Sequence, residues 1–329
     1  MGLAEDFSQP NFSLNGILGE VIYVESRNPR NYYDSLNASD TCEKIEITGK
    51  LFLIQRAEVS PVVIIVPGSL GVGENHLQHA ETIVSQGVSV FVLDPFTNRN
   101  VKSTVANQTP FSFAASAFDV LMALQTLSEH PAIDQDQISA QGHSRGGSAV
   151  LMASIRQFAD PIVGADVSFK GVYAVYPWCG HQFHTPSIGR TKLRAIVGER
   201  DNWLSVQQVQ SQIQAISLNG GEASIRIVQG AAHSFDRAEE VYEISEASVA
   251  PEAPTIYLDA AGSMIDPVTG EADSTATDRT HFISAIESGF GRRGAHMGGV
   301  GEQPSIFRED MLKFHLVVLS DEKKKKIEI

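Results

Sequence analysis

The sequence predicts an α/β fold with a mostly parallel sheet that is flanked by helices on both faces. One observation is that short, continuous apolar runs such as VVIIV at 62–66 have the pattern of strands buried on both faces. A second is that these runs alternate with stretches of helical periodicity, which indicates βαβ units. The alternation continues without a break from about 45 to 236. We therefore expect a single domain over 1–329, with a core at about 45–236 and a C-terminal extension at 237–329.

The elements of the core follow one another in regular order. The strand at 45–55 alternates apolar and polar residues, which is typical of a strand with one buried face. The expected strands lie at 45–55, 62–66, 88–94, 137–142, 170–177, 193–198 and 223–230. The expected helices lie at 75–86, 111–129 and 204–217, and a further helix opens at Gly146.

The segment after Asp236 has a different texture. Residues 244–278 are acidic and rich in Ala, Pro, Thr and Gly, whereas 278–289 and 304–319 have helical patterns. The sequence does not decide whether this extension is a lid, an edge element of the sheet or a contact in a homodimer.

Composition and charge exclude several classes of protein. Hydrophobic residues make up 42% of the 329 residues and charged residues 19%, which allows a large core and argues against disorder. The net charge of -14 repels phosphate backbones and anionic membranes. The one basic run, Lys323–Lys326, is short and terminal, and we interpret it as a solvated tail. No apolar run reaches the length of a membrane span, so we expect neither a nucleic-acid partner nor a membrane partner.

The beginning of the chain and its cysteines bear on the compartment. The first residues lack the basic and apolar regions of a signal peptide, so a cytoplasmic location is expected, although a removed leader stays open. Cys42 and Cys179 are too few for a disulfide framework or a four-cysteine zinc site. Two free thiols and a single disulfide are both compatible with the sequence.

A serine stands at a junction of strand and helix. Residues 142–146 read G-H-S-R-G, and they lie between the expected strand at 137–142 and the helix that opens at Gly146. A serine on such a sharp turn, with glycines beside it, presents its Oγ above the carboxyl edge of the sheet. We predict that Ser144 is a nucleophile. The alternative is a Gly-Ser turn that only caps a helix.

A serine hydroxyl needs a base within reach and a group that orients this base. In folds that carry this motif, the acid and the histidine follow in that order, on loops after later strands. Asp201 follows the strand at 193–198, and His233 follows the last expected strand. We therefore predict that Ser144, Asp201 and His233 form a catalytic triad. Glu199 is a less favoured candidate for the acid.

An acyl-transfer site also needs backbone N–H groups for the oxyanion. One is predicted from Arg145, the residue after the nucleophile. The other is predicted from Ser69, with Leu70 as the second choice, in the loop PGSLGVG at 67–73. The glycine spacing of this loop fails at the third glycine of a dinucleotide-binding loop. We therefore expect no cofactor.

Further side chains follow the strand ends, where a substrate would lie. The candidate substrate-binding residues are Leu70, Glu74, His76, Arg99, Trp178, His184 and Trp203. Arg99 could bind a substrate carboxylate, but a structural ion pair with Asp94 is the favoured interpretation. Two pairs of histidines are spaced by three residues, at 76 and 79 and at 181 and 184. Neither pair has a carboxylate-rich frame, so no metal site is expected.

With these residues in place, the chain resembles the dienelactone hydrolase-like branch of the α/β-hydrolases. The resemblance spans about 45–236 and rests on VVIIVPGSLG, VLDPFTNR, QGHSRGG, VYPWC, GERDNW and GAAHSFD. It implies the α/β-hydrolase fold and hydrolysis of small carboxylic esters or lactones without a cofactor. By this resemblance Ser144 is the nucleophile, Asp201 the acid and His233 the base. Dienelactone hydrolase itself uses a cysteine nucleophile, so Ser144 favours its serine esterase relatives.

Other functions fit the same residues. An amidase, peptidase or thioesterase would use the same triad, and so would a lyase or cyclase that handles a proton rather than an acyl group. A non-catalytic binding protein is the rival from a different class, and a broken triad would indicate it. All three positions are filled here, which favours the enzyme.

Overall fold

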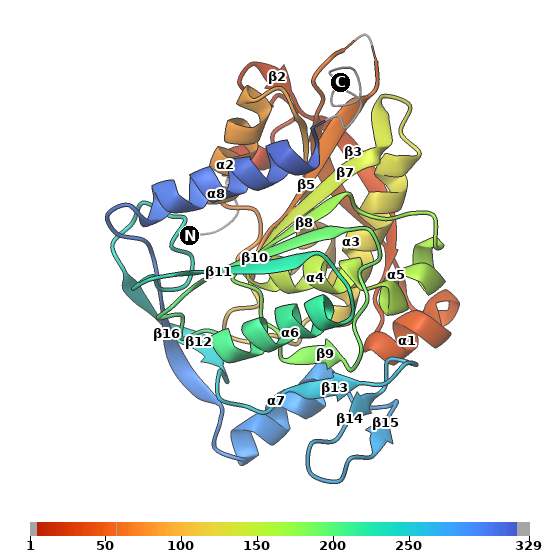
Figure 1. The fold of residues 1–329 in the computed structure, drawn as a ribbon, viewed down its shortest axis with the longest axis vertical. Coiled ribbons are helices and arrows are strands. Elements are labelled where there is room, and N and C mark those ends of the chain that lie inside the picture. The colour runs from red at the N-terminus through yellow and green to blue at the C-terminus, as the bar shows by residue number, and fades with distance from the viewer. Residues whose placement is uncertain (1–4, 57, 321–329) are drawn as a thin grey trace.

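A computed structural model describes residues 5–56 and 58–320 of the chain. The lysine run at 323–326 lies outside the described residues. An eight-stranded sheet forms the centre of the molecule, in the order β3-β4-β6-β5-β7-β8-β10-β11 (Figure 1). Its strands are β3 (Glu20–Arg27), β4 (Lys44–Phe52), β5 (Ser60–Val66), β6 (Ser89–Asp94), β7 (Ile133–His143), β8 (Gly171–Val175), β10 (Lys192–Gly198) and β11 (Ala223–Val228).

The strand directions identify the fold. β4 is antiparallel to both of its neighbours, β3 and β6. The pairs from β6 through β5, β7, β8 and β10 to β11 are all parallel. A parallel sheet in this order, with one antiparallel strand near its edge, is the α/β-hydrolase fold, which confirms the predicted fold class.

Helices cover both faces of the sheet, as predicted (Figure 1). One face carries α2 and α8, and the other carries α3, α4 and α6. The helices are α1 (Tyr32–Asn37), α2 (Glu74–Ser85), α3 (Phe113–Ser128), α4 (Arg145–Ser154), α5 (Arg156–Val163), α6 (Val206–Leu218), α7 (Asp278–Glu287) and α8 (Gln303–Val318). Short 3-10 turns lie at Glu5–Ser8, Ser39–Thr41 and Thr97–Arg99.

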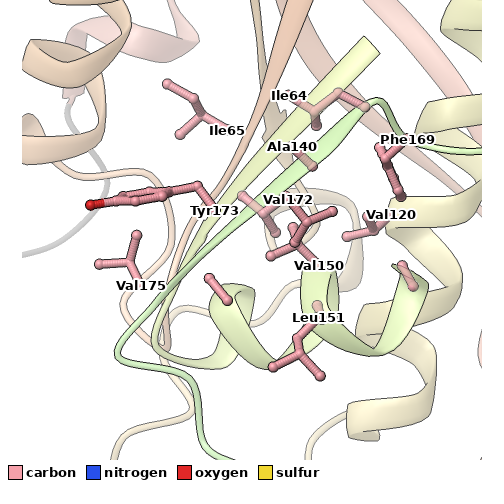
Figure 2. Close-up of a cluster of buried hydrophobic side chains, with 14 of the residues drawn as sticks. Ile64, Ile65, Val120, Ala140, Val150, Leu151, Phe169, Val172, Tyr173 and Val175 are labelled. Atoms are coloured by element: carbon pink, nitrogen blue, oxygen red, sulfur yellow. The ribbon is translucent and has the colours of Figure 1, made fainter. Parts of the chain in front are cut away.

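The core lies between the sheet and these helices. Ile64 of β5 and Val172 of β8 are fully buried, and Figure 2 shows Val172 beside Val150 of α4 and Val120 of α3, with Ile64 near Ala140 of β7. Burial of one such side chain contributes about 1.5–3 kcal/mol. The continuous apolar runs in the sequence therefore reflect strands that pack against helices on both sides.

The C-terminal extension does not form one compact lid. β12 (Tyr242–Val249) pairs with β16 (Arg292–Met297) in an antiparallel ladder. The short strands β9 (His181–Phe183), β13 (Ile256–Leu258), β14 (Met264–Ile265) and β15 (Ala272–Asp273) form a separate small sheet. α7 and α8 fall on the two segments that were predicted to be helical. α8 packs on the central sheet, so this part of the extension belongs to the core (Figure 1).

Some elements were not predicted. The edge strand β3 and the short strands of the extension are missing from the sequence interpretation, as is the hairpin of β1 (Ser13–Leu14) and β2 (Ile17–Leu18). β3 exposes Val21 and Tyr23, so its apolar residues do not all mark a buried face. Cys42 and Cys179 are free thiols. Among the described residues no helix is long and apolar enough to cross a membrane.

Candidate active site

Ser144 lies on a sharp turn between β7 and α4. Its φ is 54°, a left-handed conformation that is strained for a residue with a side chain. The turn is held by the Ser144 N–H, which donates to the carbonyl of Val175 at 2.9 Å. The Ser144 carbonyl accepts from the N–H of Ser148 at 2.9 Å, so the helix begins directly after the turn.

The two glycines of the motif are required by close backbone approach. A Cβ on Gly142 would collide with the carbonyl of Gly146, and a Cβ on Gly146 would collide with the carbonyl of Val66. A larger residue at either position would therefore push the turn off the sheet.

The structure brings the three predicted triad side chains together. The Nε2 atom of His233 lies 3.0 Å from the Oγ atom of Ser144, and its Nδ1 atom lies 2.7 Å from Oδ2 of Asp201. The other carboxylate oxygen of Asp201 accepts from the N–H of Trp203 at 2.9 Å. Because an ionised carboxylate accepts only, it fixes the His233 tautomer with the proton on Nδ1 and leaves Nε2 free to accept from the serine.

Two aromatic rings enclose the imidazole of His233. The ring of Tyr176 lies at a centroid distance of 4.5 Å on one side, and the ring of Trp203 stacks at 5.1 Å with an interplanar angle of 21°. The Trp203 indole N–H donates to the carbonyl of His296 in β16 at 2.8 Å. The imidazole is thus held in position by side-chain packing as well as by its hydrogen bonds.

The extension also braces the loop that carries His233. The Gly298 N–H donates to the carbonyl of His233 at 2.8 Å, and Met297 forms a bridge with His233. The Asn202 side chain, next to Asp201, accepts from the N–H of His296 at 2.9 Å. Sequence analysis missed this contribution, because nothing in the sequence pattern links β16 to the loops after β10 and β11.

A buried polar network lies behind the triad around Asp236. Its carboxylate accepts from the Tyr176 hydroxyl at 2.8 Å, from the Asn75 amide at 2.9 Å and from His79 at 2.8 Å. Burial alone would raise the pKa of Asp236, but these hydrogen bonds and nearby imidazoles hold it well below its usual value. Asp236 therefore fixes the histidine loop and makes no contact with His233 in this network.

Backbone N–H groups of the loop after β5 and of the start of α4 lie next to Ser144. Gly71 donates to the carbonyl of Gly68 at 3.0 Å, which closes a turn with Ser69 and Leu70 at its centre. A Cβ on Gly68 would lie 3.2 Å from Cβ of Ser144, so this turn passes over the serine. The N–H groups of Ser69 and Leu70 have no acceptor within 5–56 and 58–320, and a helix leaves the N–H of its first residue, here Arg145, unpaired.

The side chain of Arg145 is occupied elsewhere. It is buried, it donates to Ser116 and to the carbonyls of Gln108 and Phe111, and its guanidinium stacks on Phe111 and Phe113. Burial lowers its pKa to about 10. With its side chain saturated, Arg145 offers the site only its backbone N–H.

Two cavities meet at Ser144, each with a volume of about 40 Å³. Ser69, Ser144, Trp203 and His233 line both. We call the first the polar cavity after Asn75, His76, Ser234 and Arg237; Gly68, Leu70, Gly71, Val105, His143, Tyr176 and Met297 complete its lining. We call the second the apolar cavity after the apolar side chains in its wall, Phe113, Trp178, Leu204, Val249, Ala250 and Phe282; Gln108, Arg145 and Ser248 complete its lining.

Arg237 is a residue of the polar cavity that sequence analysis missed. The guanidinium of Arg237 adds positive charge to the cavity. Its Nε atom is buried without a hydrogen-bond partner among the described residues. His76 in the same cavity accepts from the N–H of Gly73 at 2.9 Å. Burial lowers the pKa of His76 to about 3, so this imidazole is neutral. The position of Arg237, four residues after His233, is the signal that could have identified it.

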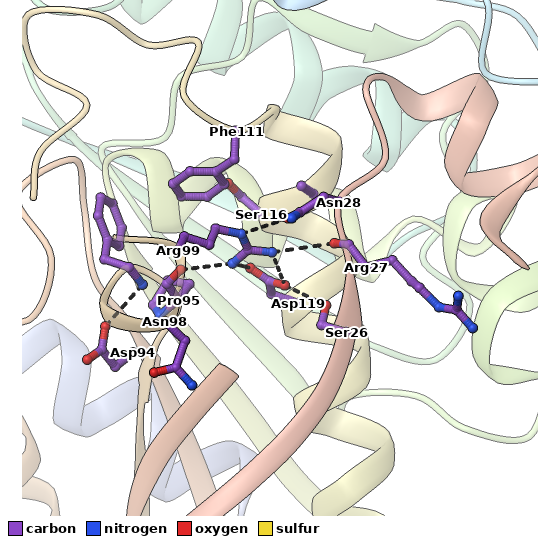
Figure 3. A network of polar contacts seen from close by, with 12 residues as sticks. Ser26, Arg27, Asn28, Asp94, Pro95, Asn98, Arg99, Phe111, Ser116 and Asp119 are labelled. Carbon is purple, nitrogen blue, oxygen red and sulfur yellow. Dashed lines mark hydrogen bonds and ion pairs between the residues drawn. The ribbon is translucent and has the colours of Figure 1, made fainter. Parts of the chain in front are cut away.

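Three of the predicted substrate-binding residues lie away from both cavities. Glu74 is exposed at the start of α2, and His184 is exposed and makes an edge-to-face contact with Tyr257. Arg99 is in a structural ion pair, but the predicted partner Asp94 is wrong. Its guanidinium donates to both carboxylate oxygens of Asp119, at 2.7 and 2.9 Å (Figure 3).

The sequence prediction failed for Arg99 because Asp94 has other hydrogen bonds. One carboxylate oxygen of Asp94 accepts from the N–H groups of Phe96 and Thr97 at 3.0 and 3.1 Å. Asp119 on α3 is fully buried and accepts from Ser26 as well (Figure 3). The partner of a buried arginine was thus set by the packing of α3 against β3 and not by nearness in the sequence.

One group of possible metal ligands lies next to the site. His79, His143 and Asp236 offer atoms within 4.8 Å of one another. These atoms already bond within the network: His79 to Asp236 at 2.8 Å, and His143 to the Tyr176 hydroxyl at 2.9 Å. The donor set is therefore a closed hydrogen-bond network, which a metal ion would have to break.

Comparison with known proteins identifies the family of the chain. The model of the Dienelactone hydrolase family matches residues 49–257. The chain belongs to the dienelactone hydrolase family. It is accordingly a carboxylic ester hydrolase. No curated protein matches the sequence.

Several solved structures of this kind are similar in fold. A putative dienelactone hydrolase from Klebsiella pneumoniae is 14% identical, with a TM-score of 0.45 over 66% of this chain and 89% of that one. A dienelactone hydrolase-like promiscuous phosphotriesterase from metagenomic libraries is 13% identical, with a TM-score of 0.48 over 83% and 100%. A thermophilic esterase from Thermogutta terrifontis is 15% identical, with a TM-score of 0.48 over 66% and 85%.

Proposed function

We propose that this family member is a serine hydrolase that cleaves small carboxylic esters or lactones through an acyl-enzyme on Ser144. The observation that carries the proposal is the pair of hydrogen bonds at His233, 3.0 Å to Ser144 and 2.7 Å to Asp201. Both distances are within the reach that proton transfer requires.

The reaction then proceeds in two steps. His233, oriented by Asp201, accepts the Ser144 proton as the hydroxyl attacks the substrate carbonyl. The N–H groups of Ser69 and Arg145 donate to the oxyanion. His233 then protonates the leaving alcohol, and water repeats the sequence on the acyl-enzyme. This mechanism needs no cofactor.

The size of the substrate follows from the two cavities. A cavity needs about 10–15 Å³ for each water-sized group, so about 40 Å³ on either side of Ser144 holds a few heavy atoms. We assign the leaving alcohol to the polar cavity, because Ser234 and Arg237 there belong to the loop of the proton donor His233. The acyl group then occupies the apolar cavity.

The test uses Ser144→Ala and a fluorophosphonate probe that reacts with activated serines. We expect the wild type to be labelled on Ser144 and the variant to lose turnover of nitrophenyl acetate by about 10⁴-fold or more. Ser148→Ala, one turn along α4, is the matched control and should keep its labelling. Full esterase activity in Ser144→Ala would overturn the proposal. The matched anilide and thioester, run in parallel, distinguish an esterase from an amidase or a thioesterase.

A further inference from the structure

A third cavity lies directly behind the apolar cavity. We call it the rear cavity; its volume is about 10 Å³, and its lining includes Gly180, Gln208, Ala253, Pro254, His281 and Ala285. The rear cavity and the apolar cavity have Trp178, Ala250 and Phe282 in common. These three side chains therefore form the wall between the two cavities.

The wall is aromatic and comes from two parts of the chain. Trp178 follows β8 in the core, whereas Phe282 comes from α7 in the extension. Their rings lie nearly parallel, at 22° and a centroid distance of 6.4 Å. Phe113 packs against Trp178 at 4.4 Å. Because these rings line the apolar cavity on one side and the rear cavity on the other, the wall separates the two cavities.

α7 is tied to the core at its N-terminal end. The carboxylate of Asp278 accepts from the N–H of Phe113 at 2.6 Å. The Asn31 amide donates to the carbonyls of Ser274 and Ala276, just before the helix, at 2.9 and 2.7 Å. Phe282 is therefore held against Trp178 by several contacts of its own helix.

A histidine pair adds a fourth tie. Nδ1 of His281 lies 3.1 Å from Nε2 of His181, which is buried in the core. His281 precedes Phe282 on α7, so this contact acts on the wall residue's immediate neighbour. Burial lowers the pKa of His281 to about 4, so the pair stays neutral and bonded at neutral pH.

We propose that Phe282, together with Trp178, sets the upper limit of acyl-chain length in this enzyme by closing the apolar cavity against the rear cavity. This inference rests on the proposed acyl-enzyme at Ser144. The apolar cavity holds an acyl group of about two to four carbon atoms at the volume needed per group. Removal of the Phe282 ring joins the two cavities and gives a longer chain the space as far as Ala285.

The experiment compares Phe282→Ala with the wild type on nitrophenyl esters from acetate to decanoate. The measured quantity is the ratio of kcat/KM for octanoate to that for acetate. We expect this ratio to rise at least about tenfold in Phe282→Ala, since even one extra methylene of burial is worth a factor of about 4. Ile283→Ala is the matched control, because Ile283 is the next residue on α7 and is exposed; its ratio should equal that of the wild type.

A second variant fills the space that the first one opens. Phe282→Ala combined with Ala285→Leu should return the ratio to the wild-type value, because the larger side chain occupies the rear cavity. If Phe282→Ala does not fold, Phe282→Leu replaces it, and a smaller rise in the same ratio is expected. An unchanged ratio in a folded variant overturns the proposal.

The outcomes also separate this inference from the proposed function. A wild type without esterase activity that depends on Ser144 contradicts the proposed function itself. A wild type that depends on Ser144, with no change in Phe282→Ala, contradicts only the role of the wall. Phe282→Ala is also tested on acetate esters of alcohols of increasing length. If this variant accepts longer alcohols but not longer acyl chains, the assignment of the acyl chain to the apolar cavity is overturned.

Discussion

The indole N–H of Trp203 donates to the backbone carbonyl of His296 at 2.8 Å, while the face of the same ring stacks on His233. Trp203 lies two residues after Asp201, and His296 lies in β16 of the extension. One side chain thus joins the acid loop, the histidine and the extension.

Changes at Trp203 should lower activity in two stages. Trp203→Phe keeps a ring against His233 and loses the hydrogen bond, which is worth about 0.5–1.5 kcal/mol, so kcat/KM should fall by about tenfold or less. Trp203→Ala loses both contacts, so its kcat/KM should fall further. The measurement is kcat/KM for nitrophenyl acetate. His184→Ala, at an exposed position outside both cavities, is the control, and equal effects at both positions would contradict the role of Trp203.

The two aspartates near His233 should behave differently when they are changed to asparagine. Asp201→Asn removes the acceptor that fixes the His233 tautomer and should lower kcat by about 10⁴-fold. Asp236→Asn leaves the triad in place but disturbs buried hydrogen bonds, which costs about 1–3 kcal/mol of stability. Initial rates and urea unfolding on both variants give the comparison. A greater loss of kcat in Asp236→Asn would reverse the assignment of the acid.

Asp278 should make stability depend on pH. Burial raises its pKa to about 6 in the folded state, whereas an unfolded aspartate titrates near 3.9. Between these values the folded state binds more protons, so stability falls as the pH rises from about 4 to about 6. Asp278→Asn removes this titration.

We expect Asp278→Asn to gain stability relative to the wild type over that interval, by up to roughly 3 kcal/mol. The difference should stay constant above pH 7. Urea unfolding of both proteins at pH 4.5, 5.5, 6.5 and 7.5 measures it. A difference that shrinks as the pH rises would show that Asp278 is stabilised in its charged form.

The buried pair of Arg99 and Asp119 should matter for stability and not for substrate binding. Removing one partner of a buried pair leaves an unpaired charge and costs about 3–5 kcal/mol. Arg99→Ala should therefore lose that amount in urea unfolding and keep the KM of a charged ester where it folds. Arg30→Ala is the control, because the side chain of Arg30 is 69% exposed in its pair with Asp34 and such pairs are worth about 1 kcal/mol or less. If Arg99→Ala raises the KM and leaves the stability unchanged, Arg99 binds substrate and its structural role is contradicted.

Much of the core could be predicted because its strands carry their signal locally. The apolar run at 62–66 indicates a buried strand, and the glycines around Ser144 indicate close backbone approach. Each of these signals is contained within a few neighbouring residues. The loops of Asp201 and His233 could be found because the order of strands fixes where such side chains meet.

The parts that were missed depend on contacts between distant segments. Phe282 reaches Trp178 across more than a hundred residues, and no periodicity records this contact. Arg99 found its partner on α3 because Asp94, although closer in sequence, is used by its own turn. β3 is an edge strand with exposed apolar residues, so its pattern lacks the alternation of a half-buried strand.

The bracing of His233 by Met297 and Gly298 affects when the molecule becomes active during its synthesis. Chains are made from the N-terminus, and early segments fold first. A ribosome-bound chain already holds Ser144, Asp201 and His233 when the supports of the histidine loop have not yet been translated. We therefore expect newly made polypeptide to stay inactive until β16 and Gly298 have been translated.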